Sequence, residues 1–178
     1  MRTRSLLGLV MALPGLFLAA CEGEAPKTVI HFKRNELVES LFVYASKEGP
    51  VLAEVHGAPF PSRENETVEA VLGAFSRAVT WRKVAFTNDR LVATRPGIRV
   101  VVAFNAPVST DGRALCRGEI PAAGQASAGG EIRMQAVFCS KDELISEVSG
   151  KIKSVSSPED KLFEKLAEQV ARDLLDHR

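Results

Sequence analysis

Apolar residues recur every three to four positions in three segments of the chain, residues 35–46, 62–79 and 157–175. This is the period of a helix that packs along one side. The last segment is the most regular, with Ser157 as the predicted N-cap and Pro158 as the first helical residue. Within the first segment, residues 41–44 fit a strand as well as a helix, so both alternatives stay open there.

Shorter apolar runs, separated by turn-rich segments, predict strands over residues 51–56, 84–87, 98–105, 113–120, 131–139 and 145–152. Residues 98–105 are apolar at nearly every position, which is typical of a central strand covered on both faces. Residues 121–130 are low in complexity and predict a hairpin tip. Together these elements predict an α+β two-layer sandwich. We expect a mostly antiparallel sheet of four to six strands, with helices mainly on one face, including the amphipathic helix at the C-terminus.

The first twenty residues have a different pattern. Arg2 and Arg4 precede an apolar stretch over residues 6–20, which is too short for a membrane span of about 20 residues. The stretch ends Leu18-Ala19-Ala20-Cys21, which resembles the bacterial lipobox. The alternatives are an ordinary signal peptide with an incidental cysteine and a buried helix of a cytosolic protein.

The lipobox resemblance implies cleavage before Cys21 and attachment of fatty acyl chains to its thiol. It divides the chain into a signal peptide (1–20), a lipidated cysteine with its tether (21–28) and a single periplasmic α+β domain (29–178). The expected location is the bacterial cell envelope, with a lipid anchor in a membrane. Glu22, in place of aspartate after the cysteine, favours the periplasmic face of the outer membrane under the sorting rule of enterobacteria.

Charge adds little to this picture. The formal net charge of +1 becomes −1 when Arg2 and Arg4 leave with the signal peptide. Basic and acidic residues are interleaved, as on an ordinary solvated surface, so nucleic acid is not an expected partner. The 158 residues that remain after removal of 20 of the 178 are enough for one domain with its own core.

Cys116 and Cys139 remain once Cys21 carries lipid, and an even pair in an exported chain predicts a disulfide. Closing a loop of about 23 residues stabilises a fold by roughly 3–3.5 kcal/mol in the chain-entropy model. A metal or redox site is the alternative. The two cysteines lack CxxC spacing, and the three histidines of the chain lie far apart, so we expect neither a metal nor another cofactor.

The pairing of these cysteines raises a question of side-chain direction. If residues 113–120 form a strand, Cys116 points to its core face, whereas Cys139 alternates with the residues facing away from the core. A bridge then needs either a bulge near residues 137–138 or a link just beyond the strand end. We therefore predict an irregularity at this position.

Known catalytic motifs are absent, including Gly-x-Ser-x-Gly and His-Glu-x-x-His, and no residue is assigned a catalytic role. His56 could be catalytic together with a neighbouring acid such as Glu54, but a structural role is the favoured interpretation. Trp81, beside Arg82 and Lys83, could contact a sugar, but we expect it to cover the core.

Several segments resemble small lipoproteins of alphaproteobacterial type whose activity is unknown. They are Gly49-Pro50-Val51, Gly57-Ala58-Pro59-Phe60, Arg99-Val100-Val101-Val102-Ala103-Phe104-Asn105, Leu115-Cys116-Arg117-Gly118 and Ser157-Pro158-Glu159-Asp160. The resemblance covers most of the chain after Cys21. It implies an intact envelope domain and no particular chemistry.

Two classes of function fit these features. The first is a non-catalytic binding or assembly accessory that contacts an envelope protein. The second is a lipid-anchored periplasmic hydrolase or peptidoglycan-processing enzyme. A deep pocket that brings His56 against an acid and a serine would favour the enzyme, and a shallow surface with one exposed apolar patch would favour the binder.

Overall fold

The computed structural model describes residues 25–122 and 130–176. Within them, one six-stranded sheet has the order β1-β6-β5-β4-β2-β3. The strands are β1 (Lys27–Lys33), β2 (Val51–His56), β3 (Phe86–Thr87), β4 (Ile98–Phe104), β5 (Ile132–Ser140) and β6 (Glu143–Ile152). The pairs β1–β6, β6–β5 and β5–β4 are antiparallel, while β2 runs parallel to β4 and to β3. The predicted α+β fold with a mostly antiparallel sheet is confirmed.

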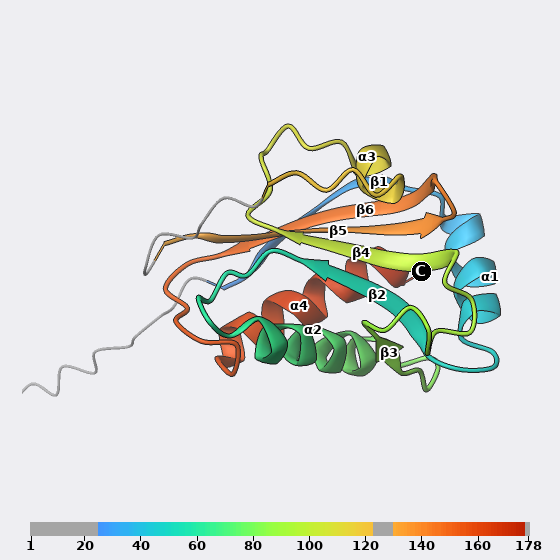
Figure 1. Ribbon diagram of the computed structural model, residues 1–178, viewed down its shortest axis with the longest axis horizontal. Coiled ribbons are helices and arrows are strands. Elements are labelled where there is room, and N and C mark those ends of the chain that lie inside the picture. Colours follow the sequence, from blue (N-terminus) through green and yellow to red (C-terminus); the bar gives the residue numbers. More distant parts are fainter. Residues whose placement is uncertain (1–24, 123–129, 177–178) are drawn as a thin grey trace, which may run out of the picture.

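Three helices cover one face of the sheet, and a short fourth helix lies on the other (Figure 1). The first three are α1 (Asn35–Ala45), α2 (Glu64–Ala78) and α4 (Lys161–Leu175), and the short one is α3 (Gly112–Cys116). Residues 41–44 are therefore helical. The helix α1 buries Val38, Phe42 and Ala45, which its 3.6-residue period places on one side.

The main core fills the space between the sheet and these three helices. Its aromatic centre includes Phe42, which meets Phe138 of β5 and Trp81 edge-on. Trp81 is thus a cover of the core, as expected from the sequence. All seven residues of β4 are buried, which confirms this strand as central.

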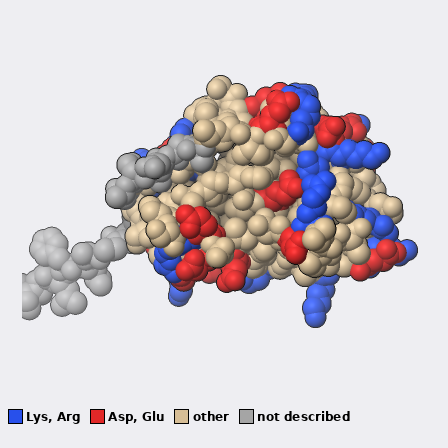
Figure 2. All heavy atoms as spheres, in the orientation of Figure 1, with Lys and Arg blue, Asp and Glu red and all other residues tan. Residues whose placement is uncertain are grey.

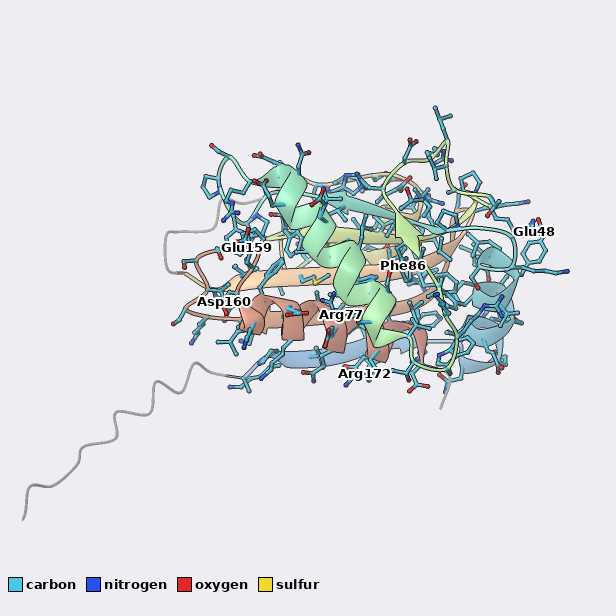
Figure 3. All side chains as sticks on the ribbon, turned by 90° about the horizontal axis from the view of Figure 1, so that it is seen from below. Glu48, Arg77, Phe86, Glu159, Asp160 and Arg172 are labelled. Carbon is cyan, nitrogen blue, oxygen red and sulfur yellow. A yellow bond between two sulfur atoms is a disulfide. The ribbon has the colours of Figure 1, made fainter. Side chains whose placement is uncertain are left out.

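The helices α2 and α4 pack against each other below the sheet, as Figure 3 shows. Arg77 of α2 bridges them with ion pairs to Glu164 (2.5 Å) and Glu168 (2.9 Å) of α4. On its other side, α4 approaches β6 closely at Gly150. A Cβ at that position would lie 2.7 Å from Leu166 Cδ1 and 2.7 Å from Val170 Cγ2. Only glycine lets the helix approach the strand this closely.

The edge strand β1 is fastened to α4 by side chains from both of its ends. Thr28 Oγ1 donates to Asp173 Oδ2 (2.5 Å) and accepts from Gln169 Nε2 (3.0 Å). Lys33 Nζ donates to the Asp173 carbonyl (2.6 Å). Burial lowers the pKa of Lys33, and Asp176 and Asp173 oppose this shift.

The strand predicted over residues 113–120 is wrong, because the chain forms α3 there. The Asp111 carboxylate accepts from Arg113 N (3.0 Å) as an N-cap, which favours a helix over a strand. Gly112 lets this cap sit tightly on the sheet, since a Cβ there would lie 2.7 Å from Glu147 Cδ and 3.1 Å from Val137 Cγ1. The strand β1, which the sequence pattern did not predict, brings the number of strands in the described sheet to six.

Two further boundaries differ from the sequence prediction. The helix α4 begins at Lys161 with Asp160 as its N-cap, not at Pro158 with Ser157. The Asp160 side chain accepts from Leu162 N (2.8 Å), and this bond fixes the helix start. The strand β1 begins at Lys27, inside the range 21–28 that the sequence analysis assigned to the lipidated cysteine and its tether.

Cys21 and the predicted signal peptide of residues 1–20 lie outside the described residues, as does most of the predicted tip at 121–130. Across residues 25–122 and 130–176, no helix has the length and apolar content that a membrane crossing requires.

Candidate functional site

The candidate site lies on the second face of the sheet, which is the face that carries α3. Pairing register places its side chains in rows that run across the strands. One row joins Val29, Ser149, Gln135 and Ala103, and the next contains Glu147 and Val137. The helix α3 covers only part of this face, with a small core around Val101, Val137 and Leu115. No other described element covers the remainder of this face.

A disulfide and a buried arginine hold α3 on the sheet. Cys116 of α3 and Cys139 of β5 form the predicted disulfide, with their Cα atoms 5.6 Å apart. Cys139 does face away from the main core, as its alternation indicates. Cys116 reaches it because α3 lies over that second face. The β5–β6 register also shifts between Phe138 and Cys139, so the predicted irregularity is present.

Arg99 of β4 is the buried arginine, with only 7% of its surface exposed. Its Nη2 donates to the Cys116 carbonyl (2.6 Å) and its Nη1 to the Lys141 carbonyl (2.9 Å). Its Nε donates to Glu54 Oε2 (3.1 Å), which neutralises the buried charge. This network makes α3 a fixed part of the fold.

Beside α3, the open part of the face forms a groove of about 430 Å³. Its floor comes from β1, β5 and β6, and its wall is the segment from Ala103 to Gly112 that leads into α3. Val108 on the wall is 86% exposed and Val29 on the floor is 55% exposed. Figure 2 shows uncharged surface across much of this view, with charged groups over α3, in a column to the right of the centre and along the lower edge.

Two polar pairs form the middle of the floor. His31 Nε2 and Ser149 Oγ lie 2.7 Å apart, joining β1 to β6. Gln135 Nε2 donates to Glu147 Oε1 (2.8 Å) and to the Thr110 carbonyl (3.1 Å). The second pair therefore ties the wall of the groove to its floor.

At one end of the groove, three cations stand in one cross-strand row. Lys151 of β6 is the register partner of Lys27 on β1 and of Arg133 on β5, and all three line the groove. Glu131 Oε2 lies 3.3 Å from Lys151 Nζ. No sequence motif indicated this row, because Lys27 lies more than 100 residues before Arg133 and Lys151 and only the sheet register brings the three together.

The structure does not bring His56 into a catalytic cluster. Glu54 engages two arginines, Arg99 and Arg90, at 3.1 and 3.0 Å. The His56 Nε2 atom is buried and makes no hydrogen bond with the described residues. Burial lowers the pKa of His56, and the nearby Glu54 carboxylate partly opposes this shift. His56 is not among the residues that line the groove.

No family model and no curated protein matches the chain. The chain is similar to a solved PelC dodecamer from Paraburkholderia phytofirmans, at 12% identity and a TM-score of 0.43, over 84% of this chain and 98% of that one. It is also similar to the dodecamer of a PelC point variant from the same organism, at 9% identity and a TM-score of 0.39, over 85% and 95% of the two chains. Within the described residues, no group of three or more histidines, cysteines and acids could hold a metal ion.

Proposed function

We propose that the chain is a lipid-anchored envelope protein that binds a partner protein in the groove beside α3 and has no catalytic activity. The proposal rests on one observation: helices cover the two faces of the sheet to different extents. Three helices bury one face. On the other face, the short helix α3, which a disulfide links to β5, covers only a part. The uncovered part keeps Val29 exposed on the floor and Val108 exposed on the wall of a concave surface.

The anchor in this proposal is Cys21, on the periplasmic face of the outer membrane. Lys27, where β1 begins, is six positions after Cys21. Fully extended, this stretch of chain reaches at most about 20 Å. Lys27 also lines the groove, so a partner bound there stays within reach of the membrane surface. A disulfide between Cys116 and Cys139 suits the same oxidising compartment.

Site-specific crosslinking in cells tests the binding face. A photoreactive amino acid replaces Val108 in one variant and Leu91, which is 95% exposed outside the groove, in the matched control. We expect a discrete protein adduct from position 108 and none from position 91. Adducts of equal yield from both positions, or from neither, would contradict a partner in the groove.

Fractionation tests the anchor separately. Conversion of Cys21 to serine removes the thiol that carries lipid. We expect the variant to leave the membrane fraction, while the Cys116→Ser variant stays there. Continued membrane residence of the Cys21 variant would refute the lipid anchor at this residue.

One specific observation favours a second candidate, a lipid-anchored hydrolase. The 2.7 Å separation of His31 Nε2 and Ser149 Oγ is that of a nucleophile and its general base. A fluorophosphonate that labels activated serines distinguishes the candidates. Intact mass of the treated protein should show no adduct for a binding protein. An adduct that disappears in the Ser149→Ala variant would establish the hydrolase instead.

A further inference from the structure

A tight turn of residues 107–110 forms part of the wall of the groove. Thr110 N donates to the Pro107 carbonyl (2.9 Å) and closes the turn, while the proline ring fixes the φ angle of its first residue. Val108 is the second residue of the turn, and 86% of its surface is exposed. An aliphatic side chain is therefore presented to the solvent on a constrained backbone.

Asn105 fixes the chain to the sheet just before this turn. Its backbone N–H donates to the Arg133 carbonyl (2.9 Å), and its side-chain Oδ1 accepts from Arg133 N (3.0 Å). The side-chain oxygen takes the place that a backbone carbonyl has in a continued antiparallel ladder. The φ angle of Asn105 is 50°, in the left-handed region that asparagine and aspartate tolerate better than other side chains. The angle and the oxygen together make asparagine well suited to this position.

The chain is fixed again on the other side of the turn. Gln135 Nε2 donates to the Thr110 carbonyl (3.1 Å), and the helix α3, which the disulfide links to β5, begins directly afterwards. Arg133 and Gln135 are two positions apart on β5, so one strand holds the segment on both sides of the turn. The position of Val108 relative to the groove is therefore set by the sheet itself.

The surroundings of Val108 favour its burial by another protein. Leu91, an aliphatic residue that is 95% exposed, directly follows Arg90, whose guanidinium pairs with Glu54 (3.0 Å). The turn of residues 107–110 contains no charged side chain, so a partner that covers it displaces water from no ionic group of the turn. A constrained backbone also loses little conformational entropy on binding. Val108 thus combines apolar contact with a position that is fixed in advance.

We propose that Val108 is a recognition residue which the partner protein encloses in an apolar pocket, and that Asn105 is the positioning residue that holds it there. This inference rests on the proposed function, because it names the residue by which a partner in the groove is recognised. The pocket that fits has the size of a branched aliphatic group and is lined by apolar side chains. Since Val108 lies on the wall of the groove, a partner that occupies the groove also reaches this residue.

Crosslinking in cells from a photoreactive amino acid at Ser109 tests the recognition residue, because this position leaves Val108 in place. Val108→Thr keeps nearly the same shape but places a hydroxyl in the apolar pocket, so the yield of the partner adduct should fall at least fivefold. Leu91→Thr is the matched control and should change the yield less than twofold. Both side chains are almost fully exposed, so neither change should shift the unfolding midpoint in urea. An unchanged adduct yield in Val108→Thr would overturn the proposal.

Two variants of Asn105 test the positioning. Asn105→Gly permits the same φ angle but removes the oxygen that accepts from Arg133 N. We expect an adduct yield from Ser109 at least fivefold lower, and amide hydrogen exchange at Arg133 at least tenfold faster. Asn105→Asp retains an acceptor oxygen and should restore both to within twofold of the native values. A native yield in Asn105→Gly, or equal losses in the two variants, would reject the role of Asn105. Val108→Thr decides the role of Val108 even where Asn105→Gly does not fold.

Failure of this inference is distinguishable from failure of the proposed function. An adduct from position 109 that persists unchanged in Val108→Thr and in Asn105→Gly would keep a partner in the groove and reject the recognition residue. Absence of any adduct from positions 108 and 109 in the otherwise native chain would reject the proposed partner itself, and this inference with it.

Discussion

Arg99 Nη2 lies 2.6 Å from the carbonyl oxygen of Cys116, so the residue that closes the disulfide is also held by a buried cation. A covalent bond and a charge-assisted hydrogen bond thus fix the same end of α3 to two strands, β5 and β4. The wall of the groove ends in this helix, and its position depends on both links.

Replacing Arg99 by alanine should destabilise the fold. The change leaves the Cys116 carbonyl without this donor and removes one of the two arginines beside the partly buried Glu54. We expect a loss of about 2 kcal/mol in the free energy of unfolding, measured by urea titration. Arg90→Ala removes the exposed partner of the same carboxylate and should cost less than about 0.5 kcal/mol. Equal losses in the two variants would argue against the buried network.

Removing the disulfide should lower stability by about 3 kcal/mol, because the bridge closes a loop with a sequence separation of 23. Cys116→Ser with Cys139→Ser tests this in urea, and a reducing agent should shift the unfolding midpoint of the wild type but leave that of the variant unchanged. Mass analysis without reductant gives an independent check. Free thiols at both positions in the native protein would contradict the bridge.

Gly150→Ala should show how closely α4 approaches β6. The added Cβ meets Leu166 and Val170 at 2.7 Å, so strand and helix must separate. Overpacking of this kind costs about 1–3 kcal/mol, which thermal unfolding would report as a lower Tm. Gly97→Ala is the control, since its Cβ would have Lys141 Cγ at 3.9 Å as its nearest neighbour. A Tm for Gly150→Ala that equals that of the control would show that the helix is free to shift.

Acid should weaken the fold through His56. Burial lowers the pKa of this histidine below the ordinary 6.5, so the unfolded chain binds a proton more readily than the folded one. Its contribution is complete above pH 6.5 and is lost as the pH falls below that value toward the folded-state pKa. We expect the unfolding midpoint in urea to fall less between pH 7.5 and 5.5 in His56→Gln than in the wild type. Identical pH profiles for the two proteins would reject this role of His56.

The elements that could be predicted from the sequence are those with a clear apolar pattern, either continuous or at helical spacing. Every residue of β4 is buried and the strand is apolar nearly throughout, whereas α4 alternates buried and exposed positions at helical spacing. The strand β1 escaped prediction because Val29 and Ile30, on opposite faces of an edge strand, are both about half exposed. The helix α3 is only five residues long, and its cap at Asp111 was the one signal that could have revealed it.

The groove itself could not be predicted from the sequence. Lys27, Arg133 and Lys151 meet only through the order β1-β6-β5, which joins the first strand to the last. Local patterns carry no information on such an order. The disulfide was predictable because the cysteine count and the expectation of an oxidising compartment suffice for it, and the predicted direction of Cys139 was also correct.

The fastening of β1 to Asp173 has a mechanical consequence. If Cys21 carries the proposed anchor and the groove holds the proposed partner, tension between membrane and partner enters the domain at Lys27 and passes through β1. Antiparallel pairing with β6 and the bonds from Thr28 and Lys33 to α4 then carry the load. The helix α2 and the strands β2 and β3 lie outside this path, so a pulled domain would lose its edge strand before its core.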